Sequence, residues 1–173
     1  VFIKARPIAG DLEAGENFLL EIGPFVWRRY YDFAAIEDVH SMKRQIHAVR
    51  GHGEIAVRGH NMKLGRGGIR EIEFFVQTQQ LIAGGRDPVL RGRTTVGMLD
   101  GLSAAGWISS ETAAGMTEAY AFLRRLEHCL QMRLDEQTHT LPEDDATLEV
   151  FARFAGFQNA AALTATVTDT LQY

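Results

Sequence analysis

The sequence predicts a mainly α-helical fold, a helical bundle with a short N-terminal strand and one possible small hairpin. Three observations support this prediction. Apolar side chains recur at helical spacing over several long segments, residues that cap or stop helices bracket those segments, and strand-like alternation is confined to short pieces. The hydrophobic residues, 46% of the chain, supply enough apolar surface for a packed core.

The first ten residues alternate in the manner of a strand. Val1, Ile3 and Ala5 share one face of that strand, and Phe2 and Lys4 share the other. A lone strand cannot satisfy its backbone hydrogen-bonding groups, so we expect its partners outside this chain. We therefore expect the chain to be a piece of a longer protein.

Two helical patterns follow the strand. The first runs from Leu12 to about Ile22, with Asp11 as its N-terminal cap and Gly23-Pro24 as its end. The second lies within residues 24–49 and stops at Gly51. Its apolar positions at helical spacing are Phe33, Ile36, Val39, Ile46 and Val49.

A possible hairpin comes next, because two β-like pieces, residues 54–57 and 61–64, flank a short polar turn. After it, a helix is predicted from Ile69 to about Ala83, closed by Gly84-Gly85. Its polar stripe, at spacings of three, four and three, consists of Arg70, Glu73, Gln77 and Gln80. Such a stripe on a largely apolar helix requires polar partners.

The longest predicted helix starts near Ser109 and is ended by Pro142. Its apolar stripe consists of Ala119, Phe122, Leu123, Leu126, Leu130 and Leu134. Two shorter helices are expected at 143–155 and at about 158–173. We expect Leu123, Leu126 and Leu130 to be buried in the core.

Composition excludes several classes of function. The chain has 173 residues, a net charge of -4 and a pI of about 5.9, whereas a nucleic-acid-binding domain is usually basic. The sequence contains no long uncharged apolar run, so it predicts no membrane span. The single cysteine fits a reducing compartment, and the six histidines have no metal-ligand spacing, so we expect no metal site in this chain.

The entrance to the helix at Ile69 is unusual, because glycines and cations precede it. With Gly68 as N-cap, Glu71 has the position of a capping-box carboxylate. Arg70 is a cation in the first turn, where it opposes the helix dipole. Either Arg70 pairs with Glu73 in a structural network, or Arg70 and Lys63 face an anionic ligand beside the turn. The residues alone leave both interpretations open.

Four segments together resemble one family. They are "IKARPIAGD", "PFVWRRYYDFAAIEDVHSMKRQI", "NMKLGRGGIREIEFFVQTQQLIAGGRDPVLR" and "FLRRLEHCLQMRLDEQTHTLP". In this order they resemble the glutamine synthetase adenylyltransferase/adenylyl-removing family, over most of the chain up to Pro142. The segment "KLGRGGIREIEF" resembles the adenylyl-removing half, and residues from Asn159 onward resemble the family only weakly.

The resemblance implies an enzyme that transfers AMP from ATP to a tyrosine of glutamine synthetase and removes it by phosphorolysis, which yields ADP. The family's centre carries a G-S sequence followed by an Asp-x-Asp pair and a third carboxylate, and those carboxylates bind Mg²⁺. This G-S and Asp-x-Asp pattern does not occur in the chain. By resemblance, residues 1–10 are the last strand of the nucleotidyltransferase domain and residues 11–173 are the helical bundle domain beside it. We therefore expect no catalytic residue and no cofactor in this chain, which should be inactive alone, while the parent uses Mg²⁺, ATP, ADP and phosphate.

The resemblance also suggests residues that position phosphate or substrate: Lys4, Arg6, Lys63, Gly67, Gly68, Arg70 and Glu73. It implies glutamine synthetase and a PII-type signalling protein as partners, a cytoplasmic location, and neither nucleic acid nor membrane as a partner. The main alternative is a regulatory module that docks one of those two proteins. An RNA-binding helical domain is a further alternative, which the acidic balance disfavours.

Overall fold

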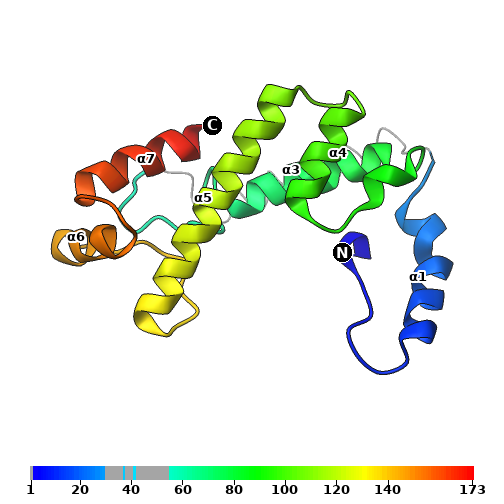
Figure 1. The fold of residues 1–173 in the computed structure, drawn as a ribbon, viewed down its shortest axis with the longest axis horizontal. Helices are drawn as coiled ribbons and strands as arrows, with labels where there is room; N and C mark the ends of the chain where they lie inside the picture. Colours follow the sequence, from blue (N-terminus) through cyan, green and yellow to red (C-terminus); the bar gives the residue numbers. More distant parts are fainter. Residues whose placement is uncertain (1, 30–36, 38–40, 42–54) are drawn as a thin grey trace. The chain divides into compact units, whose positions relative to one another are not determined.

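The computed structural model describes residues 2–29, 37, 41 and 55–173, and helices are its main secondary structure (Figure 1). The 3-10 helices are η1 (Phe2–Lys4) and η2 (Pro88–Arg91), and the α-helices are α1 (Leu12–Val26), α3 (Ile69–Ala83), α4 (Thr95–Ala104), α5 (Ser110–Leu134), α6 (Asp145–Phe154) and α7 (Ala160–Gln172). The predicted mainly helical fold is confirmed. Unit 1 consists of Val1–Arg44 and Phe74–Ala113, and unit 2 of Gln45–Glu73 and Ala114–Tyr173.

The predicted N-terminal strand is wrong for the residues described. Phe2–Lys4 form the 3-10 helix η1 instead, and the amide of Ala5 donates to the carbonyl of Phe2 at 3.0 Å. A 3-10 turn satisfies backbone groups locally, whereas a strand needs a neighbour. The side chain of Ile3 is buried within unit 1 and anchors this segment to that unit.

The first helix begins as predicted but ends later. The carboxylate of Asp11 caps α1 by accepting a hydrogen bond from the amide of Ala14 at 3.0 Å. The helix continues through Gly23-Pro24 to Val26 because Pro24 lies in the last turn, where its missing N–H removes only one hydrogen bond. The helix predicted within residues 24–49 lies almost wholly outside the described residues, as do its five apolar positions.

The predicted hairpin is also wrong, because its second piece pairs elsewhere. Asn61 forms an isolated antiparallel bridge with Thr140. The amide of Met62 donates to the carbonyl of His139 at 2.8 Å, and the amide of Leu141 donates to that of His60 at 2.9 Å. This pairing explains a second error. The helix α5 ends at Leu134, before Pro142, since Asp135 has a positive φ of 50° and the chain then turns back to meet residues 60–62.

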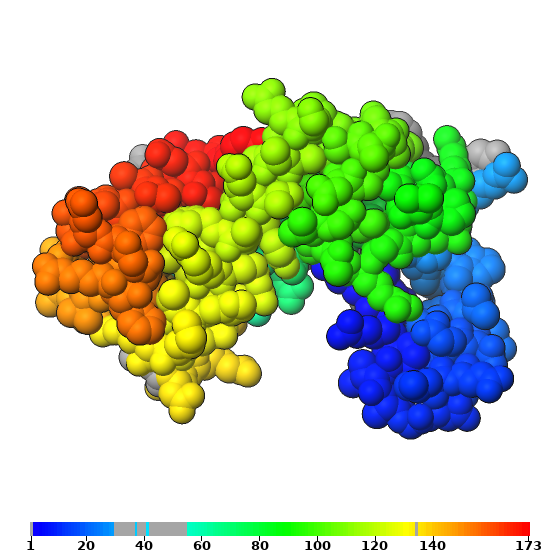
Figure 2. Space-filling model, in the orientation of Figure 1, coloured from blue at the N-terminus to red at the C-terminus, as the bar shows by residue number. Residues whose placement is uncertain are grey.

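The core of unit 2 confirms four of the six predicted stripe positions of α5, while Phe122 is partly buried and the side chain of Leu134 lies outside the described part of the chain. Ala119, Leu123, Leu126 and Leu130 are buried there, together with residues from the turn before α3 and from the last two helices. Those two helices match the prediction, and Asp144 and Asn159 cap them. In Figures 1 and 2 α6 and α7 lie side by side and cover one flank of α5. Their buried contributions are Leu148, Phe151, Ala152, Leu163, Val167 and Leu171.

Unit 1 has a smaller core around α4 and the second part of α3. Leu90, Leu99 and Leu102 are fully buried. The side-chain Nε2 of buried Gln80 donates to the carbonyl of Leu90 at 2.9 Å and to that of Gly92 at 2.8 Å. The predicted need of the α3 stripe for polar partners is therefore met at Gln80 by backbone carbonyls.

Candidate functional site at the entrance of helix α3

The start of α3 uses its own turn to satisfy its first amides. The amide of Ile69 donates to the carbonyl of Met62 and that of Arg70 to the carbonyl of Lys63, both at 3.0 Å. An anion bound at a helix N-terminus needs such amides to be available. An anionic ligand at this place must therefore be held by side chains and not by the first amides of the helix.

Glu71 acts as a capping carboxylate, as the sequence suggests, but with a shifted partner. Its Oε2 accepts a hydrogen bond from the amide of Gly67 at 3.3 Å. The amide of Gly68, the expected partner, donates instead to the carbonyl of Gly65 at 3.0 Å. The local reason for an acid at position 71 is thus the closure of the turn.

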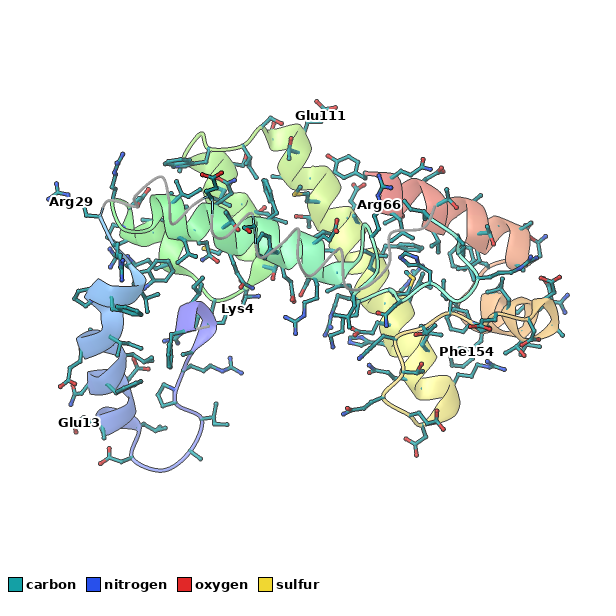
Figure 3. The ribbon with its side chains drawn as sticks, turned by 180° about the vertical axis from the view of Figure 1, so that it is seen from behind. Lys4, Glu13, Arg29, Arg66, Glu111 and Phe154 are labelled. Atoms are coloured by element: carbon teal, nitrogen blue, oxygen red, sulfur yellow. The ribbon has the colours of Figure 1, made fainter. Side chains whose placement is uncertain are left out.

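Close backbone packing explains the glycines. Gly67 has a φ of +71°, and a Cβ built on it would lie 2.1 Å from the carbonyl oxygen of Leu171 in α7. A Cβ on Gly68 would lie 2.7 Å from the carbonyl oxygen of Met62. Only glycine fits both positions without a backbone shift. Arg66, just before them, lies beside the C-terminal end of α7 (Figure 3), where a cation complements the helix dipole.

The predicted pair of Arg70 and Glu73 is present. Nη1 of Arg70 donates to Oε2 of Glu73 at 3.0 Å. The hydroxyl of Tyr120, on α5, donates to the other oxygen of Glu73 at 3.3 Å. The Arg70 side chain is 58% exposed and that of Glu73 is 15% exposed. The acid is therefore the inner partner and the guanidinium the outer one.

Glu127 on α5 is a functional candidate that the sequence analysis missed. Its side chain is 1% exposed, and its Oε2 accepts a hydrogen bond from Nη1 of Arg124 at 2.5 Å. Nζ of Lys63 lies 3.4 Å from Oε1, and Nδ1 of His139 lies 2.9 Å from the same atom. The spacing from Leu123 and Leu130 places position 127 on the apolar stripe, and an acid on that stripe is the signal that could have revealed it.

The two oxygens of Glu127 are held differently. Oε2 has the hydrogen bond from Arg124, whereas Oε1 accepts no hydrogen bond within the described part of the chain. The contacts of Lys63 and His139 with Oε1 are therefore contacts between charges, His139 contributing when it is protonated. Arg124 is 37% exposed and Lys63 is 28% exposed, so both cations extend from the buried acid toward solvent.

His60 closes the inner side of the same turn. Burial lowers its pKa from the ordinary 6.5, and a hydrogen bond with the backbone of Arg66 opposes that shift to a lesser degree. Its Nε2 is buried without a hydrogen-bond partner among the described residues. A Cβ on Gly65 would lie 2.6 Å from that nitrogen, so this glycine makes room for the imidazole.

The seven predicted positioning residues divide between the two units. Lys63, Gly67, Gly68, Arg70 and Glu73 all belong to the turn and first residues of α3 in unit 2. Lys4 and Arg6 belong to unit 1, where Nζ of Lys4 donates to Oγ1 of Thr95 at 2.9 Å and Arg6 is exposed. Each group is therefore understood within its own unit.

Metal ligands and membrane-spanning helices are two further features that bear on function. Among the described residues, no group of three or more His, Cys, Asp or Glu side chains is placed to hold a metal ion. In the same part of the chain, no helix combines the length and the apolar character needed to cross a membrane.

Comparison with known proteins gives consistent results. The family model described as GlnD PII-uridylyltransferase matches residues 40–172. The bifunctional glutamine synthetase adenylyltransferase/adenylyl-removing enzyme of Mesorhizobium japonicum is 68% identical over 160 residues, which are 92% of this chain and 16% of the relative. The enzymes of the same name from Rhizobium meliloti and Xanthobacter autotrophicus are 66% and 60% identical over 93% and 99% of this chain. The chain spans about one sixth of the length of these relatives, 16–17% in each case.

Proposed function

Because this chain belongs to the GlnD PII-uridylyltransferase family, we propose that it is the helical part of a bifunctional enzyme that adenylylates and deadenylylates glutamine synthetase. The observation that carries the proposal is the identity of 60–68% with enzymes of that name over more than nine tenths of this chain. The turn before α3 and the polar face of α5, which give this chain its candidate site, both lie inside the matched range.

The proposed chemistry is the transfer of AMP from ATP to a tyrosine of glutamine synthetase and its removal by phosphate, which releases ADP. Mg²⁺ in the parent enzyme would neutralise the phosphate charge. The sequence of this chain contains no G-S followed by Asp-x-Asp, so we assign those carboxylates to another part of the parent. The role proposed for this chain is to position the substrate protein or its phosphate beside that centre.

Within the chain, the positioning role is assigned to the outer cations of the candidate site. Arg70 is supported by its exposure, and Glu73 by its hold on Arg70. Gly67 and Gly68 act through the backbone, since they allow the turn to close. Lys63 has a second partner in Glu127. Lys4 and Arg6 remain candidates in unit 1.

The test compares two polypeptides. The full-length parent and the 173-residue chain are each incubated with adenylylated glutamine synthetase, phosphate and Mg²⁺, and ADP is measured against a control without protein. We expect turnover by the parent alone. Absence of turnover in the parent would overturn the assignment of activity, and turnover by the short chain would overturn the claim that the centre lies elsewhere.

A second candidate function is docking of glutamine synthetase or a PII-type signalling protein. The feature that favours it is α1, where Phe18, Leu20 and Phe25 are exposed, because exposed apolar patches often mark contact surfaces. Binding of either protein by the chain, weakened in Leu20→Ser but not in the same-helix control Asn17→Ser, would support docking.

The single cysteine, Cys129, is free, which is consistent with the cytoplasmic location that we propose.

A further inference from the structure

In both ion-pair groups of unit 2 the acid lies beneath its cation. Glu127 is fully buried below Arg124 and Lys63, which are partly exposed. Glu73 is mostly buried below Arg70, which is the most exposed member of the set. The charges that solvent meets at this surface are therefore positive, although the chain as a whole is acidic.

The two groups belong to one continuous surface. The amide of Arg70 donates to the carbonyl of Lys63 at 3.0 Å, which ties the two cations of the turn together. Tyr120, the partner of Glu73, is one helical turn before Arg124 on α5, and residues four apart share a helix face. Lys63 and Arg124 thus share Glu127, and Arg70 is linked to α5 one turn before Arg124 through Glu73 and Tyr120.

The donor chemistry of this face suits a phosphate group. A guanidinium has five N–H donors in a planar fork, and a contact through Nη1 leaves other donors directed elsewhere. Nη2 of Arg124 also lies 3.4 Å from Nε2 of exposed His128. The ion pairs here join three cations to two carboxylates, and the carboxylate of Glu71 in the same turn accepts a hydrogen bond from the amide of Gly67. Paired guanidiniums bind phosphate oxygens with better geometry than ammonium groups do.

We propose that Arg70 and Arg124, together with Lys63, form a phosphate-binding surface in which Glu73 and Glu127 orient the cations from below. This inference rests on the proposed function only for the source of the phosphate, a nucleotide or free inorganic phosphate. Arg124 lies outside the glycine-rich turn and supplies the second guanidinium. Glu127 is a positioning residue, because it reaches the ligand only through Arg124 and Lys63.

The test is direct binding to the 173-residue chain, which keeps the result independent of any activity of the parent. Inorganic phosphate, AMP and ADP are titrated separately at constant ionic strength, and the arginine Nε–H signals are followed by nuclear magnetic resonance. We expect the signals of Arg70 and Arg124 to shift with saturation. Tighter binding of ADP than of phosphate identifies a nucleotide as the source, and equal binding identifies free phosphate.

Three variants make the result decisive. Arg70→Gln should weaken phosphate binding about tenfold, the loss of one charge-assisted hydrogen bond. Arg125→Gln is the matched control. Arg125 is exposed next to Arg124, but its guanidinium lies over the Phe122 ring, 5.9 Å from the ring centre, and not beside Glu127 or Glu73. This variant should therefore bind phosphate as tightly as the unmodified chain. Arg124→Lys keeps the charge beside Glu127, so the variant should fold and still bind less tightly. The absence of saturable shifts, or equal losses in Arg70→Gln and Arg125→Gln, would overturn the proposal.

Discussion

Glu73 and Glu127 are two carboxylates of unit 2 that are buried to different degrees. The Glu73 side chain keeps 15% exposure and its partner Arg70 is 58% exposed, so water screens this pair more than the pair of Glu127. Glu127 is fully buried, and within the described residues its carboxylate accepts one hydrogen bond, from Arg124. A buried acid cannot exchange a lost partner for water at the same cost.

The difference shows why a motif read along the sequence points to the wrong residue for stability. Arg70 attracts notice because it breaks the rule for charges at helix starts. Arg124 breaks no such rule, but it compensates the buried charge of Glu127. Exposure of the pair, which the sequence does not give directly, decides which of the two arginines matters for folding.

The largest effect should come from Arg124→Ala. Breaking a buried ion pair by removing one partner costs about 3–5 kcal/mol, and we expect about 3 kcal/mol because Lys63 remains beside Glu127. Urea unfolding of the chain measures it. Arg125 is the exposed neighbour, and the free energy of unfolding of Arg125→Ala should stay within about 0.5 kcal/mol of that of the unmodified chain. Equal losses in the two variants would remove the distinction between the buried and the exposed pair.

A double-mutant cycle sharpens the same comparison. Glu127→Gln keeps the shape of the side chain and removes its charge, so Arg124→Ala should cost less in that background. The expected coupling energy between positions 124 and 127 is about 1–3 kcal/mol, in the range of contacting residues. The cycle of Arg70 with Glu73 should give less than about 1 kcal/mol. Coupling of similar size in both cycles would contradict the ranking.

The Arg70→Ala change itself should be mild. An exposed ion pair contributes about 0.2–1 kcal/mol, and removal of a first-turn cation offsets part of that loss. Thermal unfolding of the chain is the measurement. A shift as large as that of Arg124→Ala would mean that Glu73 depends on Arg70 more than its exposure implies.

The smallest expected effect is a pH dependence from His60. Because burial lowers the pKa of His60 from 6.5 in the folded chain, the unfolded chain takes up a proton first as the pH falls. The free energy of unfolding should therefore decrease as the pH falls through 6.5 and level off below the folded pKa. The pKa values of Asp144 and Glu149 are also lowered, and their ordinary values of 3.8 and 4.5 place their effects at lower pH.

The control for this pH dependence is His60→Gln, which cannot titrate. Between pH 7 and pH 5.5, the free energy of unfolding of this variant should change less than that of the unmodified chain. The measurement is urea unfolding at a series of pH values. A parent chain whose stability is flat over that range, or rises as the pH falls, would contradict the assignment of the shift to His60.

Helical periodicity and capping residues were sufficient to predict most helices of the fold. Asp11, Gly84 and the α5 stripe mark elements that the structure confirms, since those signals act within a few residues of each other. The hairpin and the end of α5 were predicted wrongly for one shared reason. Asn61 and Thr140 are far apart in the sequence, and their pairing takes both segments away from their local preferences.

The candidate site was predictable to the same extent. The turn, Glu71 and the Arg70–Glu73 pair follow from spacing within one helix entrance. Glu127 and His139 join the site only through the packing of α5 against the turn, which no local pattern specifies. The glycines are recognisable as unusual in the sequence, but the backbone carbonyl of Leu171 that requires glycine at position 67 belongs to α7.

The contact between Gly67 and the carbonyl of Leu171 has a practical consequence for where the polypeptide can be shortened. Only a weak family resemblance was expected for the segment from Asn159 onward, but the matching family model extends to residue 172. The helix of this segment places the carbonyl of Leu171 against Gly67 and fills the core with Leu163 and Val167. A polypeptide shortened before Ala160 would keep every motif of the turn and lose the surface that gives the turn its shape. The smallest autonomous version of unit 2 must therefore extend through Gln172.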